Sequence, residues 1–348
     1  MATEILGKAV KIGFLQQDKS ANHWSAPRDA TADYQNQYYA ANVSLPKHGV
    51  TIDQIGVINS SSGVMREENR QKINAVSGLN NMNFEGWVTK ETWASHLCAC
   101  FQKVTEAATT PYRKQFSPAD SLLDWANNEG FIYTVAFNPG VSARGQILEN
   151  AVLEEYNLMI NPMAAGVERN LKHSGLWVGN ELNDDQTFSG TWASPSNTLY
   201  NTTSSGFEAD LNVVVGGTTL TDICFKNFEM RWKANYQNRC ATTGGKANNY
   251  HWAPSLTFVI DLEYTSTTAP LIGAYKSGSN TYISAFTNSV ADTSEGGVTI
   301  ATTKGELTAD VEYYEGEYQA VRLQFEALRP SAGWGDVVVI SDAIDGGY

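Results

Sequence analysis

The stretch Ser255–Phe286, SLTFVIDLEYTSTTAPLIGAYKSGSNTYISAF, predicts a strand, a short helix and a second strand. Apolar and polar side chains alternate in its first part, which is the period of a half-buried strand. The hydroxyls of Thr265–Thr268 are suitable helix N-caps, and Pro270 falls in the first helical turn, where its missing N–H costs nothing. Strand composition returns at Thr281–Phe286. We take this unit as the element around which the chain is organised.

An earlier part of the chain shows the same order of elements. Met82–Trp87 has the composition of a strand, Lys90–Val104 carries an apolar stripe at helical spacing, and Phe131–Gly140 is again strand-like. Each unit is followed by two alternating strands: Ala151–Ile160 and Leu171–Gly179 in the first copy, Val298–Leu307 and Tyr318–Leu328 in the second. The pattern favours an internal duplication. The alternative is two unrelated β-rich domains, because the composition of strands is narrow.

The length of 348 residues favours two domains over one. We predict a first domain over residues 1–195, which includes a long N-terminal loop, and a second over 206–328. Ser194–Gly206 is a candidate linker, and Arg66–Asn81 is expected to be charged and then loop-like. Residues 329–348 are expected to form a C-terminal arm outside the core. Long helical patterns do not occur, so the expected fold class is mainly β with one short flanking helix in each copy.

The composition is acidic, with 24 Lys and Arg against 37 Asp and Glu and a formal charge of −13. An acidic surface repels nucleic acid and anionic membranes. It is compatible with a protein that lets DNA pass without gripping it. The N-terminus lacks the apolar core of a signal peptide, and no apolar run reaches transmembrane length. We therefore expect assembly in the cytosol, with reduced thiols.

His96, Cys98 and Cys100 are the first candidates for metal ligands. On a helix, His96 and Cys100 share a face while Cys98 points elsewhere, and a structural zinc needs four ligands. We therefore interpret the three as buried helix residues, and we expect neither a metal site nor a cofactor.

Paired carboxylates such as Glu154-Glu155 and Asp184-Asp185 suggest glycoside hydrolysis, which needs two carboxyl groups at a set separation. Adjacent carboxylates on a strand point to opposite faces, however, so the pattern is that of a solvated face. The sequence contains no serine-hydrolase, P-loop or dinucleotide-binding motif. We expect a protein that is not an enzyme. The nine dispersed tryptophans favour core or interface positions over a sugar-binding platform.

The segment Gln16–Gly49 is long, polar and aromatic. Long irregular loops in compact domains are usually functional or disordered, and Trp24, Tyr34, Tyr38 and Tyr39 argue against disorder. Aromatic side chains are enriched at protein–protein interfaces. We therefore expect these four residues to contact another subunit.

The order of elements resembles that of the major tail tube proteins of long-tailed bacteriophages. The resemblance begins with the strand GKAVKIGF and the aromatic loop, and continues with a polar loop that leads into a strand and the helix WASHLCACF. It includes the polar strand pair around ERNLKHSGLWVGNELNDDQTFSGTW and the second half from APLIGAYKSGSNTYISAF to ADVEYYEGEYQAVRLQFEALRP. In all it covers Lys8 to Leu328. It is a resemblance of pattern, because the family has no catalytic motif to match.

The resemblance implies tandem tail-tube-like domains, each a β-sandwich or small β-barrel with a flanking helix. Family members with two such domains form homotrimeric rings with pseudo-sixfold symmetry, whose inward sheets join into one inner β-barrel. The rings stack into a tube through which DNA is ejected. The implied partners are copies of this chain, other tail proteins at the tube ends, and double-stranded DNA that passes without specific binding. No membrane is involved; the implied location is the virion tail, assembled in the host cytoplasm.

Strands with one face toward a wet lumen would account for the polar alternation. The candidate lumen-lining residues are Glu154, Glu155 and Glu306, on the acid-bearing strands of the two copies. The four aromatic residues of the N-terminal loop are the candidates for contacts between rings. Thr105–Asn128 and Arg329–Tyr348 have no place in the minimal family plan, and we expect decoration or inter-ring staples there.

Two other functional classes stay open on the sequence. One is a carbohydrate-binding or host-recognition β-module of a phage tail, and the other is a glycoside-cleaving β-protein. A tail terminator or baseplate ring protein is a close structural variant of the leading hypothesis.

Overall fold

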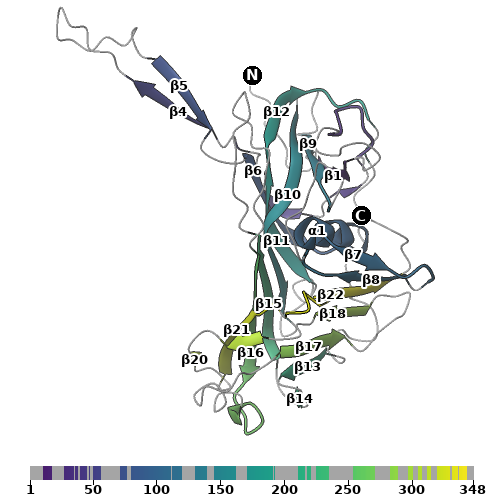
Figure 1. The fold of residues 1–348 in the computed structure, drawn as a ribbon, viewed down its shortest axis with the longest axis vertical. Helices are drawn as coiled ribbons and strands as arrows, with labels where there is room; N and C mark the ends of the chain where they lie inside the picture. The colour runs from purple at the N-terminus through teal and green to yellow at the C-terminus, as the bar shows by residue number, and fades with distance from the viewer. Residues whose placement is uncertain are drawn as a thin grey trace, which may run out of the picture.

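The computed structural model describes residues 11–17, 27–34, 36–37, 40–44, 47, 50–55, 71–76, 80–110, 112–119, 130–138, 145–161, 171–190, 192, 211–215, 218–220, 225–234, 254–270, 283–288, 297–300, 305–307, 312–314, 320–329, 331–335 and 337–342. The described elements are two large antiparallel sheets, a projecting hairpin and one helix (Figure 1). The mainly β fold predicted from the sequence is therefore confirmed. Neither large sheet closes into a barrel.

The larger sheet has 13 strands, eight of which form one unbroken path that we call the long sheet. In spatial order its strands are β19 (Gly305–Leu307), β21 (Ala320–Ala327), β16 (Ser255–Glu263), β15 (Phe225–Lys233), β10 (Gly145–Ile160), β11 (Lys172–Gly179), β6 (Asn80–Trp87) and β3 (Ala40–Val43). The other strands of this sheet are β1 (Lys11–Gln16), β2 (Asn36–Gln37), β9 (Tyr133–Asn138), β12 (Glu181–Gln186) and β20 (Glu312–Tyr314).

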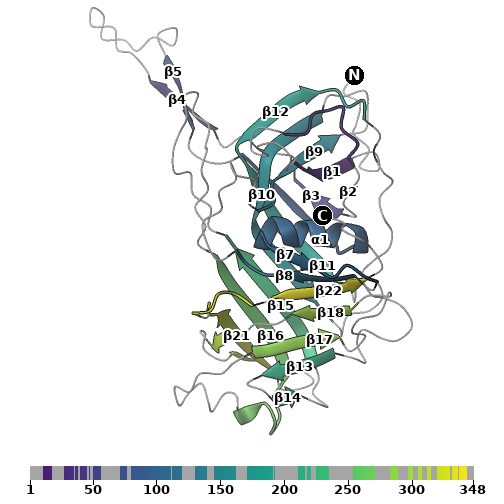
Figure 2. The ribbon, with the colours of Figure 1, turned by 45° about the vertical axis from the view of Figure 1, so that its right-hand side comes forward.

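The second large sheet has seven strands. Their spatial order is β14 (Thr218–Leu220), β13 (Leu211–Val215), β17 (Ile283–Asn288), β18 (Gly297–Ile300), β22 (Val338–Asp342), β8 (Tyr112–Phe116) and β7 (Val104–Glu106). Figure 2 shows that these strands run across the strands of the long sheet, as in an orthogonal sheet packing. Val298, Val338 and Ile340 of this sheet belong to the same hydrophobic core as Phe258 and Leu323 of the long sheet.

The helix α1 (Lys90–Phe101) lies on the buried face of the long sheet (Figure 2). Near its middle, the ring of His96 lies 5.1 Å from that of Phe84 on β6. At its end, the ring of Phe101 meets Trp232 on β15 edge to face at 4.9 Å. The helix therefore packs against both halves of the long sheet.

Helix α1 ends earlier than the predicted Lys90–Val104. Gln102 follows its last residue with a left-handed φ of 66°. The side-chain amide of Gln102 donates hydrogen bonds to the carbonyls of Ala99 at 2.8 Å and Phe131 at 3.0 Å, and its oxygen accepts one from the Phe131 N–H at 2.7 Å. This cap satisfies backbone groups at the helix end and so favours termination there.

One pattern of strand pairing occurs twice in the chain. In the first half, β1 pairs with β2 and β9, β9 with β10, β10 with β11 and β12, β11 with β6, and β6 with β3. In the second half, β13 pairs with β14 and β17, β17 with β18, β18 with β22, β19 with β21, β21 with β16, and β16 with β15. The continuous strand β10 takes the places of both β18 and β19. This equivalence is what the predicted duplication requires.

The two halves lie side by side in the long sheet and in the same order. The order β3-β6-β11-β10 is followed by β15-β16-β21-β19. All neighbouring strands are antiparallel, so equivalent strands of the two halves also run in the same direction. The second set therefore continues the first as a repeat along the sheet.

The expectation of a C-terminal arm outside the core needs correction. Residues 338–342 form β22, and the side chains of Val338 and Ile340 are buried. The neighbour of β22 is β8, which lies within the Thr105–Asn128 insertion. The two features that have no place in the minimal family plan thus pair with each other within one chain. They connect the first half of the chain to the sheet of the second half.

A two-stranded hairpin, β4 (Val50–Ile55) and β5 (Gln71–Val76), projects from the body of the molecule in both ribbon views (Figures 1 and 2). The prediction that the second part of Arg66–Asn81 is a loop is therefore wrong, because this part contains β5. Cross-strand pairing with β4 makes a strand of this polar segment, which local composition did not favour. The predicted strand Val298–Leu307 is likewise two strands, β18 and β19, in different sheets.

Candidate functional site

The long sheet has one buried face and one polar face. On β6, Met82 and Phe84 are buried, while Asn83 and Glu85, which alternate with them, are exposed. The pairing register carries this division from strand to strand, because directly opposed residues lie on the same face. The polar side chains placed on this face are Asn81, Asn83, Glu85, Glu155, Asn157, Lys172, Ser174, Asn227, Glu229, Arg231, Lys233, Ser255, Thr257, Asp261, Glu263, Arg322, Gln324 and Glu326. We call this surface the polar face.

An ion pair on the polar face joins the two halves of the chain. Lys233 Nζ on β15 lies 2.8 Å from Glu155 Oε1 on β10, at the junction of the two strand sets. The hydrogen bond and the charge of Glu155 raise the pKa of Lys233 above its usual value. Both side chains are about half exposed, so the pair adds little to stability.

Two further ion pairs lie in the second strand set. Arg322 on β21 donates to both carboxylate oxygens of Asp261 on β16, at 2.7 and 2.9 Å. Asp261 is buried, with 6 % of its side chain exposed, whereas Arg322 is 42 % exposed. Arg231 Nε donates to Glu229 on the same strand at 2.8 Å. The fourth basic residue of the face, Lys172, lies over the ring of Trp87.

The three predicted lumen residues occupy different environments. Glu155 lies on the polar face with Lys233. Glu154 is the extra residue of a β-bulge in β10; it is half-buried, and burial and the nearby Glu155 raise its pKa. Glu306 lies in β19, with its backbone opposite Glu326. The bulge could not be recognised from the sequence, because it depends on pairing with β11.

The predicted inter-ring aromatic residues are placed only in part. Tyr34 is fully buried in its own chain, with its ring 5.1 Å from Trp192 and 6.1 Å from Phe188. Its hydroxyl donates to the Asp29 carbonyl at 3.1 Å, and burial raises its pKa. The contacts of Tyr34 are therefore internal. Trp24, Tyr38 and Tyr39 lie outside the described residues.

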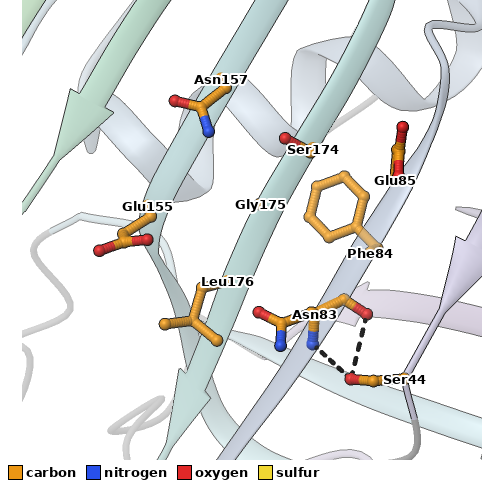
Figure 3. A pocket seen from close by; sticks show the side chains of 9 residues that line it. All are labelled: Ser44, Asn83, Phe84, Glu85, Glu155, Asn157, Ser174, Gly175 and Leu176. Carbon is orange, nitrogen blue, oxygen red and sulfur yellow. Dashed lines mark hydrogen bonds between the residues drawn. The ribbon is translucent and has the colours of Figure 1, made fainter.

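A hollow of about 350 Å³ lies on the polar face, and the sequence pattern did not predict it. Its lining comes from β6, β10, β11 and the end of β3: Ser44, Asn83, Phe84, Glu85, Glu155, Asn157, Ser174, Gly175 and Leu176 (Figure 3). Ser44 Oγ accepts a hydrogen bond from the Asn83 N–H at 2.9 Å. A Cβ at Gly175 would lie 2.7 Å from the Phe84 ring, so the glycine is needed for close packing. A glycine within a strand is the signal that could have located this region.

The buried face carries a histidine pair. The rings of His96 and His173 are fully buried, with centroids 4.8 Å apart. His96 Nδ1 donates to the Thr92 carbonyl at 2.7 Å, and the Tyr156 hydroxyl lies 3.2 Å from His173 Nδ1. Burial lowers the pKa of His96 to about 3 and the pKa of His173 well below its usual value. Both histidines are therefore neutral at physiological pH.

The interpretation of His96, Cys98 and Cys100 as buried residues is confirmed, since each is fully buried. Within the part of the chain that the structure describes, no group of His, Cys, Asp and Glu side chains could hold a metal ion. The described helix is too short to cross a membrane. The sequence matches no protein-family model and no curated protein.

Proposed function

We propose that this chain is a structural virion protein that self-assembles into the stacked rings of a phage tail tube. One observation carries the proposal: two equivalent sets of four strands lie side by side, in the same order and direction, in one open sheet with a polar face. An open sheet made of repeats is what a ring subunit with two tube domains requires. Three chains then give a ring of six domains.

The two ends of the long sheet support closure into such a ring. β3 lies at one end of the path, and β19 at the other. Exposed strand edges favour pairing with another chain. The in-chain junction, where β10 pairs with β15 over Glu155–Ile160 and Phe228–Lys233, shows how one set joins the next. In the proposed ring, β19 pairs with β3 of the next copy as β10 pairs with β15, and such head-to-tail contacts close when the rotation closes.

The polar face forms the wall of the lumen in this proposal. A conduit for DNA must not hold the phosphates, which bind through Lys and Arg with release of counterions. Three of the four basic side chains described on this face are engaged by carboxylates. The adjoining part of the face presents the neutral amides of Asn83 and Asn157. The face is thus suited to passage rather than to binding.

Electron microscopy of the purified full-length protein tests this function directly. Rings or tubes of uniform diameter are expected. Monomers that bind glycans on an array would favour a carbohydrate-binding or host-recognition module instead. Rings that never stack would point to a tail terminator or baseplate ring protein.

The projecting hairpin is the element best placed to join neighbouring rings. An isolated two-stranded hairpin is only marginally stable in water, so a partner surface is expected to cover it. We predict that replacing residues 50–76 with a short Gly/Ser linker leaves the thermal unfolding midpoint nearly unchanged, because the hairpin stands away from the core (Figures 1 and 2). The same variant is expected to form single rings and no long tubes in electron micrographs.

A substitution in the hollow provides the control for the hairpin variant. Ser174→Ala changes a partly exposed position on β11 and removes no strand. It is expected to form tubes of normal length. Normal tubes from the hairpin deletion would contradict the assigned role of β4 and β5.

A further inference from the structure

We infer that Glu155, Glu229 and Asp261 act as guard carboxylates, which keep the basic side chains of the polar face from gripping double-stranded DNA. The inference rests on the proposed function, in which this face lines the lumen. It attributes the absence of DNA binding in the lumen to three specific ion pairs rather than to the net negative charge of the chain.

Each of the three basic side chains is engaged by a carboxylate of the same sheet. Arg322 gives two of its donors to one carboxylate, that of Asp261. This bidentate arrangement is also the one in which arginine would recognise a phosphate. Arg231 gives its Nε donor to Glu229, and Lys233 is held at 2.8 Å by Glu155. Each of the three cations is therefore engaged by an acid within the same sheet.

The basic side chains of the three pairs are open to solvent. The side chains of Arg231, Lys233 and Arg322 are 49 %, 50 % and 42 % exposed, so solvent and a passing polyanion can reach them. Exposed ion pairs contribute little to stability. The pairs are expected to affect phosphate binding more than stability. A DNA phosphate must displace the carboxylate from the cation and also approach the negative charge of that carboxylate.

The three cations lie together on the second strand set. Arg231 and Lys233 lie two residues apart on β15, and Arg322 is on β21, separated from β15 only by β16. Without their acids they would form one basic patch on the second strand set. In a ring of three chains that patch would recur around the lumen and meet successive phosphates.

The test measures binding of a short double-stranded DNA of arbitrary sequence to full-length protein by fluorescence anisotropy, between about 50 and 200 mM salt. The variants are Glu155→Gln, Glu229→Gln and Asp261→Asn, alone and combined. Wild-type protein is expected not to bind. The triple variant is expected to bind, with each released cation adding about 0.9 to the magnitude of the slope of log K against log salt.

The matched control is the double variant Glu85→Gln with Glu326→Gln. These acids lie on the same polar face, are exposed, and form no ion pair with a described residue. The control therefore removes two negative charges and releases no cation. It is compared with the double variant Glu155→Gln with Glu229→Gln, and circular dichroism verifies that all variants are folded.

The outcomes separate the inference from the proposed function. Equal DNA binding by the two double variants would overturn the guard role, because net charge alone would then explain the result. A triple variant that is folded and does not bind DNA would also overturn it. Tube formation by wild-type protein is scored separately by electron microscopy, so that failure to assemble counts against the proposed function alone.

Discussion

Trp177→Ala lowers the free energy of unfolding by about 3–5 kcal/mol. Trp177 is fully buried on β11, where its ring lies 5.8 Å from Tyr133 and 6.0 Å from both Phe14 and His96. Its removal leaves a cavity between α1 and the long sheet that these rings cannot fill without moving. Chemical denaturation, monitored by tryptophan fluorescence and circular dichroism, measures the loss.

Trp87→Ala is the matched control for this substitution. Trp87 lies on the neighbouring strand β6, half-buried on the polar face, with Lys172 over its ring. The same change in side-chain size there leaves no enclosed cavity, so a loss of about 1 kcal/mol or less is expected. Equal losses for the two variants would show that the long sheet does not have the buried and polar faces assigned to it.

Acidification destabilises the fold through His96 and His173. The folded chain keeps both pKa values below the value of about 6.5 that is usual for histidine in an unfolded chain. Below that pH the unfolded chain therefore takes up protons that the folded chain does not. The stabilisation is complete above about pH 6.5 and decreases as the pH falls. For His96, whose pKa in the folded chain is about 3, the loss is about 1.4 kcal/mol per pH unit down to that pH, and His173 acts in the same direction.

The variant His96→Phe isolates this contribution from that of the carboxylates. Phenylalanine keeps an aromatic ring against Phe84 and His173 and has no titrating group. The difference in unfolding free energy between wild-type protein and the variant is expected to shrink or reverse in sign between pH 7 and pH 4. Urea denaturation at several pH values measures it. A difference that stays constant over this range would contradict the burial of His96 as a neutral side chain.

Much of the local structure could be predicted from the sequence. The alternation in Ser255–Glu263 predicts β16, and the apolar stripe from Trp93 to Phe101 predicts α1. Both signals come from residues close together in the chain, so the period of apolar side chains is sufficient. The similarity of the two strand–helix–strand units is predicted from the same kind of signal, and beyond Pro270 the predicted helix of the second unit lies outside the described residues.

The pairing of distant segments could not be predicted. β5 lies in a segment that is polar overall, and it is a strand because β4 pairs with it. β22 belongs to the core because β8, more than 200 residues earlier, lies beside it. Tyr34 was expected at an interface, yet it fills a space beside Trp192 and Phe188 of its own chain. In each case the deciding partner lies outside the segment itself, so the composition of the segment does not reveal it.

The sequence by itself therefore determined the β class, the helix, the repeated order of elements and the two-faced character of the strands. Only the tertiary structure decided which face is polar and open, because strand alternation is the same whichever side the helix covers. It also decided that Glu155 meets Lys233 across the junction of the two halves, while Glu154 falls in a bulge. The register of β10 against β11 and β15 sets these contacts, and register arises only when strands distant in the chain come together.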